Sequence, residues 1–201
     1  MIEHGVPDIR KMQQDDAKKK YHLENRKLIL TFGLISRNKG IETVIEALPA
    51  VVKKYPETLY LICGNTHPEV FKRSGEEYKN YLNLLIKKYG LEKNVSFDSN
   101  FLSEQKIFEY LYACDIFITP YKAQKQITSG TLSYALGAGA AIISTPYWHA
   151  EEVLTDGRGI LFDYGNSRQL SEIIINLFDN PDKLILIRKK SYEYGKNLKW
   201  S

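Results

Sequence analysis

Two cations stand in a short loop that begins and ends with glycine. Residues 33–40 join an apolar run to a segment with helical spacing. Arg37 and Lys39 lie just before that helix, where free backbone N–H groups and the positive end of the helix dipole attract anions. These features predict a diphosphate site, and the alternative is a glycine-bounded loop with exposed cations. The order of residues fits neither a P-loop nor the Gly-x-Gly-x-x-Gly pattern, which argues against a dinucleotide ligand.

A second anion site is predicted at the start of a later helix. Ser129 and Thr131 flank Gly130 where helical spacing begins. The backbone N–H groups of Gly130, Thr131 and Leu132 would all point toward an anion there. The alternative is that Ser129 is an ordinary helix N-cap. Gln126 lies in the same loop, shortly before this turn.

Two histidines follow strand-like runs, where ligands of such folds often bind. His67 lies within residues 64–69, and His149 lies in a later loop. Surface histidines without a role are the alternative for both. The four histidines of the chain are too dispersed to predict a metal site. Cys63 and Cys114 have no histidine at a metal-binding spacing, and we interpret both as packing residues.

Alternating strand-like and helix-like runs must position these loops. Short apolar runs predict strands, and apolar residues spaced along one helical face predict helices. Strands are predicted at 27–33, 58–64, 94–97, 115–120, 140–146 and 159–162. Helices are predicted at 40–55, 78–89, 103–114, 128–136, 167–178 and 182–194, with a polar helix at 13–21.

This alternation predicts an α/β fold with a doubly wound, Rossmann-like parallel sheet and helices on both faces. The crossovers should be right-handed. In such folds ligands bind at the carboxyl ends of the strands, near the switch in strand order. The site is therefore expected in the loops that follow the strands, at 33–40, 64–76, 98–102, 120–131 and 145–152.

The composition is that of one globular domain. The chain has 201 residues, of which 43% are hydrophobic and 26% charged, so disordered and collagen-like chains are excluded. No apolar run approaches the ~18 residues that cross a bilayer, and the first residues lack a signal-peptide core. The net charge of +4 comes from dispersed lysines. It indicates solvated helix faces and no nucleic-acid partner, with a polyanion or membrane-surface patch as the alternative. A reducing, cytoplasmic setting fits the two separated cysteines.

Taken together and in order, these motifs resemble one enzyme family. The set is similar to the C-terminal, nucleotide-sugar-binding domain of GT-B glycosyltransferases of the retaining group 1 class, family 4. The resemblance runs from about residue 2 to the end of the chain, and it implies one half of a GT-B fold. It is carried by residues 3–8, the loop that ends at Gly40, and residues 64–69, 115–120, 128–139 and 144–152.

The functional residues of the family are matched unevenly. Lys39 and the glycine after it match a Lys-Gly pair that grips the donor diphosphate, but Leu34 replaces the family's arginine and Arg37 is the expected substitute. Gln126 and Tyr134 stand where members often carry two glutamates, which contact the donor sugar and the ribose. The resemblance thus implies Gln126 and Lys39 as catalytic residues. It implies a donor-binding set of Arg37, Lys39, Gly64, Asn65, His67, Ser129, Gly130, Thr131, Leu132 and Tyr134.

The implied reaction moves a sugar, such as a hexose, from a nucleoside diphosphate sugar to a sugar or glycan acceptor, as in polysaccharide biosynthesis. No metal and no cofactor are implied, because cations and helix amides stabilise the leaving diphosphate. Residues 1–26 are expected to be a lead-in from an interdomain linker, and residues 27–201 the donor-binding domain.

An N-terminal GT-B domain would then act in cis or in trans, and the isolated chain would be inactive. Peripheral contact with a membrane is a further expectation. The alternatives are a non-catalytic nucleotide-sugar-binding module or partner subunit, and another GT-B-like activity such as an epimerase or a phosphorylase.

Overall fold

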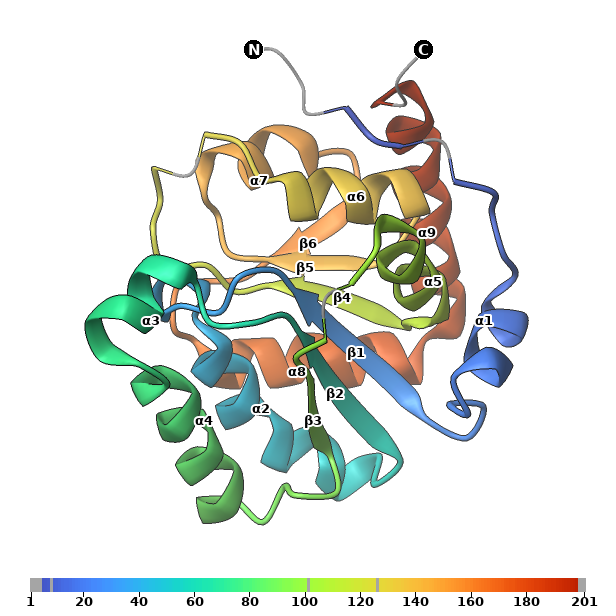
Figure 1. Ribbon diagram of the computed structural model, residues 1–201. Helices are drawn as coiled ribbons and strands as arrows, with labels where there is room; N and C mark the ends of the chain where they lie inside the picture. Colours follow the sequence, from blue (N-terminus) through green and yellow to red (C-terminus); the bar gives the residue numbers. More distant parts are fainter. Residues whose placement is uncertain (1–4, 8, 101, 126, 199–201) are drawn as a thin grey trace.

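The computed structural model describes residues 5–7, 9–100, 102–125 and 127–198. In this part of the chain a six-stranded, fully parallel sheet has the order β3-β2-β1-β4-β5-β6 (Figure 1). The chain thus builds outward from β1 to β3 and returns to β4 on the other side of β1, which creates a switch point between β1 and β4. The strands are β1 (Lys27–Phe32), β2 (Thr58–Cys63), β3 (Val95–Asp98), β4 (Ile116–Thr119), β5 (Ile142–Ser144) and β6 (Gly159–Leu161).

Helices cover both faces of the sheet (Figure 1). One face carries α2 (Ile41–Lys54), α4 (Glu77–Lys88) and α8 (Ser167–Asp179). The other carries α1 (Gln14–Lys20), α5 (Glu104–Ala113) and α6 (Gly130–Ala138), and α9 (Pro181–Gly195) contacts both α6 and α8. The predicted doubly wound, Rossmann-like fold is confirmed.

Two apolar cores lie on the two faces of the sheet. Successive side chains of β1 alternate between them, since neighbouring residues of a strand point to opposite faces. Leu28 and Leu30 pack in the core that includes α5 and α6, whereas Ile29 packs in the core under α2 and α8. Burial on both faces explains why this strand reads as a continuous apolar run.

Two short helices were not predicted. Residues 64–76 and 145–152 were expected to be loops, but they contain α3 (Pro68–Ser74) and α7 (Trp148–Val153). Proline at the first position of α3 is favourable because its ring fixes a helical φ and its missing N–H would be unpaired there. Helices this short bury too few residues to produce a visible apolar period.

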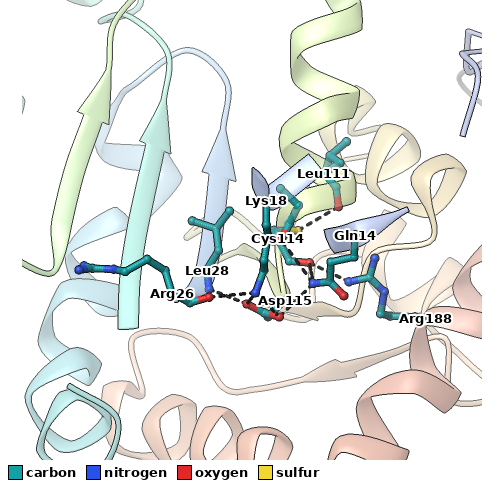
Figure 2. A network of polar contacts seen from close by, with 9 residues as sticks. Gln14, Lys18, Arg26, Leu28, Leu111, Cys114, Asp115 and Arg188 are labelled. Carbon is teal, nitrogen blue, oxygen red and sulfur yellow. Dashed lines mark hydrogen bonds and ion pairs between the residues drawn. The ribbon is translucent and has the colours of Figure 1, made fainter. Parts of the chain in front are cut away.

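The lead-in is fastened to the sheet at the edge where the strands begin. Asp115, just before β4, accepts hydrogen bonds from Lys18 Nζ (2.8 Å), Gln14 Nε2 (2.9 Å) and the backbone N–H of Leu28 (2.6 Å) (Figure 2). Arg188 of α9 donates to the carbonyl before Asp115 at 2.7 Å (Figure 2). Lead-in, central strands and α9 are thereby joined opposite the loops that carry the predicted site.

None of the helices in the described residues has the length and apolar character needed to cross a bilayer.

Candidate functional site

The loops after β1 and β4 meet at the switch point. Gly40 has a φ of +63°, and a Cβ there would lie 2.0 Å from the Pro120 carbonyl oxygen, so the contact requires glycine. The Lys122 N–H donates to the Asn38 carbonyl at 3.0 Å. The Lys122 ammonium also pairs with the buried carboxylate of Glu42, at the start of α2. The backbone that carries the predicted diphosphate lysine is therefore held against the β4 loop.

Lys39 lies within this junction. Its Nζ donates to Tyr121 Oη at 2.7 Å and stands 4.2 Å from the centre of the Tyr121 ring. Tyr121 Oη is in turn 2.8 Å from Thr131 Oγ1, in the first turn of α6. A Cβ on Gly33 would lie 3.3 Å from Lys39 Nζ, so glycine leaves room for the ammonium over the loop. Among the ion pairs of the described residues none involves Lys39, and its charge is available to an anion.

The start of α6 supplies hydroxyl and amide groups beside Lys39. Ser129 Oγ accepts from the Leu132 N–H at 3.3 Å, which confirms the N-cap alternative and gives the Leu132 amide a partner within the turn. Ser129 Oγ also lies 3.1 Å from Thr131 Oγ1. The backbone N–H groups of Gly130 and Thr131 lie in the first turn of α6, where N–H groups have no acceptor within the helix. Their role in anion binding stays a prediction.

The two candidate histidines serve local structure. His149 is 5% exposed, and its Nδ1 accepts a hydrogen bond from the Ser129 N–H at 3.0 Å. This bond holds the residue that caps α6. The surface alternative is therefore wrong for His149. His67 Nδ1 accepts from the Glu69 N–H at 3.2 Å and caps α3. Accepting at Nδ1 requires that nitrogen to be unprotonated in both rings.

Arg37 faces away from Lys39. Its Nη2 donates to Glu77 Oε1 at 2.6 Å, and its guanidinium lies 5.6 and 5.8 Å from the ring centres of Tyr78 and Tyr81 in α4. Residues 37–39 form a 3₁₀ turn, in which side chains two residues apart leave on different sides. The structure thus does not bring Arg37, the expected substitute for the family arginine, to Lys39.

A cavity of about 260 Å³ opens beside Lys39, over the ends of β1 and β2. It is mostly apolar, because Phe32, Cys63, Leu102 and Ile107 contribute to its wall. Gly64 has a φ of +139°, and a Cβ there would lie 2.1 Å from the Gly33 carbonyl, so the two loops close tightly at the cavity floor. The complete lining is Phe32, Gly33, Leu34, Cys63, Gly64, Asn65, Asn100, Leu102, Ile107 and Thr131.

The structure brings the predicted Gly64 and Asn65 to this cavity together with Thr131. The Asn65 carbonyl accepts from the Ile35 N–H at 2.8 Å. A bridge between Ile35 and Thr66 continues the pairing beyond the strands. The loops after β1 and β2 therefore form one rigid wall of the cavity.

Tyr134 packs against Phe32, one of the residues that line the cavity. Its ring contacts those of Phe32 and Phe108, with centroid distances of 6.4 and 5.4 Å. Its hydroxyl donates to Glu104 Oε1, the first residue of α5, at 2.9 Å. Burial and this carboxylate raise the pKa of Tyr134 to about 12. The Glu104 carboxylate thus lies beside Tyr134, the residue expected to contact the ribose.

Gln126, the predicted donor-sugar residue, lies outside the described residues. Its role stays a prediction.

Both cysteines are buried thiols, as the packing interpretation requires. Burial raises the pKa of Cys114 to about 12 and the pKa of Cys63 still further, so neither is a nucleophile near neutral pH. Within the part of the chain that the structure describes, no group of three or more His, Cys, Asp or Glu side chains is arranged to hold a metal ion.

Three residues around the candidate site were not predicted. Tyr121 and Lys122 brace the Lys39 loop, and Glu104 bonds to Tyr134. Tyr121 directly follows a buried strand and a proline, which is a usable signal for a residue at the sheet's carboxyl edge. Glu104 gives no such signal, because a glutamate in the first turn of a helix is ordinary.

Comparisons with known proteins agree with this architecture. A family model described as glycosyl transferases group 1 matches residues 12–198. An uncharacterized glycosyltransferase of Methanocaldococcus jannaschii is 29% identical over 187 residues, which are 92% of this chain and 43% of that protein. The chain spans about half the length of the curated relatives it matches.

Solved structures show the same fold. HepE of Anabaena, in complex with UDP and glucose, superposes with a TM-score of 0.80 at 20% identity, over 94% of this chain and 49% of that one. The C-terminal domain of LpcC, a group 1 glycosyl transferase of Francisella tularensis, gives a TM-score of 0.76 at 22% identity, over 94% and 92% of the two chains. The fold is thus that of the C-terminal half of a GT-B glycosyltransferase. Because the family model also covers most of its length, the chain belongs to the glycosyl transferases group 1 family.

Proposed function

We propose that this chain binds the nucleoside diphosphate sugar donor of a glycosyl transfer reaction, with the diphosphate beside Lys39. One observation carries the proposal: the Lys39 ammonium stands at the switch point, without a carboxylate partner among the described residues, next to the start of α6. A lysine, two hydroxyls and a helix N-terminus are a suitable set of donors for phosphate oxygens.

The adjacent cavity would take the base. Its apolar wall suits a flat ring. Thr131 and Gly33 line the cavity, so it lies next to the proposed position of the phosphates. Uracil is the base we propose, since HepE of Anabaena binds UDP and UDP-glucose. The Glu104 carboxylate, which Tyr134 holds at 2.9 Å, would accept hydrogen bonds from ribose hydroxyls.

The chemistry follows from where charge develops. The bond between the anomeric carbon and the β-phosphate oxygen breaks while the acceptor oxygen bonds to that carbon and loses its proton. Negative charge grows on the diphosphate, where Lys39 and the α6 amides would stabilise it. Gln126 would orient the donor sugar through its amide. The family resemblance favours retention at the anomeric carbon and catalysis without a metal ion.

Acceptor binding belongs to a second domain in this proposal, supplied in cis or in trans. The support is that curated relatives are about twice as long as this chain. The acceptor would be a sugar or glycan, as in cytoplasmic polysaccharide biosynthesis.

Peripheral membrane contact is proposed for α9. Ile185 and Leu186 are 61% and 52% exposed there, and Lys189 and Lys190 follow within a turn. Adjacent apolar and cationic side chains suit an anionic membrane surface. We expect the chain to cosediment with anionic vesicles and the Ile185→Ser variant to stay in the supernatant. Equal cosedimentation of the wild-type chain with neutral vesicles would contradict the proposal.

Calorimetry with UDP and with uridine tests the proposed donor site. Lys39→Glu places an anion beside the phosphates and should abolish UDP binding, while uridine should bind wild type and variant alike. Lys189→Glu is the matched control, because it makes the same charge change at an exposed position on α9. UDP affinity that is unchanged in Lys39→Glu, or equally lost in both variants, would overturn the proposed site.

A further inference from the structure

The Tyr121 hydroxyl contacts three residues of the proposed diphosphate site. Tyr121 follows β4 and is 4% exposed. Its hydroxyl lies 2.7 Å from Lys39 Nζ, 2.8 Å from Thr131 Oγ1 and 3.5 Å from Ser129 Oγ. One hydroxyl thus connects the loop after β1 to the first turn of α6.

We propose that Tyr121 is a positioning residue for donor binding, which fixes the Lys39 ammonium and the Thr131 hydroxyl before the diphosphate arrives. The inference rests on the proposed function, because it assigns Tyr121 a role only through Lys39 and Thr131. Neither the sequence motifs nor the family comparison points to this residue.

The directions of the hydrogen bonds follow from the chemistry of the groups. A lysine ammonium can only donate, so Tyr121 Oη accepts from Lys39. The single hydrogen of the tyrosine hydroxyl is then available to Thr131 Oγ1. Thr131 keeps its own hydrogen for Ser129 Oγ or for a phosphate oxygen. Two further N–H groups of the Lys39 ammonium can also reach the ligand, so the bond to Tyr121 need not break on binding.

Holding the Lys39 ammonium in place before the diphosphate arrives lowers the entropic cost of binding. The lysine side chain has several rotatable bonds, and a ligand that must order it loses affinity. The aromatic ring below the ammonium, with 4.2 Å to its centre, adds a cation–π attraction that holds the charge at the same point.

Tyr121 is itself held rigidly. Its ring stacks on the buried ring of Tyr147 at 5.0 Å, and its carbonyl accepts from Thr145 Oγ1 at 2.6 Å. The preceding carbonyl, of Pro120, packs against Gly40. A rigid support is what a positioning residue needs, since a mobile tyrosine could not restrict the lysine.

Tyr121→Phe tests the inference, because it keeps the stacked ring and removes only the hydroxyl. Its UDP affinity should fall by about 5- to 30-fold, while uridine affinity stays unchanged. Tyr60→Phe is the matched control: Tyr60 is also buried and also loses one hydroxyl bond, to Thr31 Oγ1, but in the strands under α2. This control should bind UDP as wild type does, at a similar melting temperature.

A double-mutant cycle separates positioning from a purely structural role. In a Lys39→Met background, Tyr121→Phe should cost clearly less UDP affinity than it does in wild type, because the lysine it positions is gone. The same fold-loss in both backgrounds would mean that Tyr121 acts on the fold in general and would overturn the inference. If Tyr121→Phe is too unstable to titrate, the Lys39 ¹⁵Nζ resonance of the ligand-free wild-type chain gives the answer. It should be protected from exchange with water, and rapid exchange would overturn the inference.

The outcomes also separate this inference from the proposed function. A wild-type chain that fails to bind UDP would overturn both. A wild-type chain that binds UDP through Lys39, together with a Tyr121→Phe variant of equal affinity, would leave the proposed function standing and overturn only the role of Tyr121.

Discussion

Lys39 and Arg37 lie in the same 3₁₀ turn, and their charges are directed to different parts of the molecule. Lys39 points into the junction with Tyr121, whereas Arg37 pairs with Glu77 on α4. Both side chains of the Arg37–Glu77 pair are about 60% exposed, so solvent screens that pair and it contributes little to stability. Of the two cations, only Lys39 lies at the junction where we propose that the diphosphate binds.

Arg37→Ala should therefore leave UDP affinity within about twofold of wild type, because an exposed ion pair is all that is lost. Lys39→Ala should weaken UDP binding by about 10- to 100-fold, the loss of a charge-assisted hydrogen bond. Calorimetric titration of the two variants side by side makes the comparison. Equal losses would show that the guanidinium swings to the ligand on binding.

Gln126→Ala, in the complete enzyme, should cut sugar transfer by about tenfold or more while UDP affinity stays near wild type. The reason is that the diphosphate is held elsewhere, by Lys39 and the α6 turn. Gln126→Glu should be partly tolerated, since one acceptor oxygen remains. Transfer rate and melting temperature are measured on the same preparations. An unchanged rate with a lowered melting temperature would make Gln126 a structural loop residue.

The residue types and their loops could be read from the sequence, but the directions of side chains could not. Spacing placed Lys39, Thr131, Gly64 and Asn65 in loops that the parallel sheet must bring together. It could not show that the 3₁₀ turn separates Arg37 from Lys39. The strand and proline before Tyr121 could place this residue at the carboxyl edge of the sheet, but could not show that its hydroxyl contacts Lys39.

At the scale of elements, the candidate site depends on hydrogen bonds that join the end of a strand to a neighbouring helix. Asp98 ends β3, and its carboxylate accepts from Lys106 Nζ at 2.9 Å and Tyr110 Oη at 3.0 Å in α5. The Asn100 N–H donates to the same carboxylate. These bonds fix the segment that carries Asn100 and Leu102, which line the cavity.

Asp98→Asn should reduce stability in a pH-dependent way. Burial opposes the charge of Asp98, but the hydrogen bonds from Lys106, Asn100 and Tyr110 outweigh it and lower its pKa below the ordinary value of 3.8. The carboxylate's contribution is therefore complete above about pH 5 and disappears as the pH falls through that lowered pKa. The variant should lose about 1–3 kcal/mol of unfolding free energy at pH 7, and this loss should be smaller at pH 3, below the ordinary pKa of 3.8.

Urea unfolding of wild type and variant at both pH values checks this expectation. Asp156→Asn is the control, because that aspartate is 77% exposed and should cost little at either pH. A loss in Asp98→Asn that is the same at pH 3 as at pH 7 would contradict the charge-based explanation.

The strands and the long helices were predictable, whereas the short helices α3 and α7 were not. β1, β2, α2 and α8 carry clear apolar patterns, and the structure has them at the expected places. The two six- to seven-residue helices, α3 and α7, were missed because helices this short bury too few residues to show an apolar period. The strand order, with β1 next to β4, could be expected only from the general rule for doubly wound sheets.

At the scale of the whole molecule, this chain has two apolar cores, and hydrogen bonds attach its lead-in to the sheet. Two apolar cores flank the sheet, and the Asp115 network joins α1, β1, β4 and α9 (Figure 2). These features support independent folding of residues 1–201. In the proposed division of labour, acceptor binding belongs to a second domain.

The isolated chain should therefore fold cooperatively and bind UDP, yet show no sugar transfer. Circular dichroism, calorimetry and a radiolabelled transfer assay measure the three properties. Addition of a cognate N-terminal GT-B domain should restore transfer. Robust transfer by residues 1–201 alone would contradict the division of labour between two domains.

The central claim is that a donor diphosphate binds at the junction of Lys39, Tyr121 and the α6 start. The most direct measurement is a crystal structure of the chain with UDP. The account predicts the β-phosphate within hydrogen-bonding distance of Lys39 Nζ and the Gly130 or Thr131 amide, with the uracil ring in the cavity lined by Leu102 and Ile107. UDP bound elsewhere, such as beside Arg37, with no phosphate contact to Lys39, would contradict it.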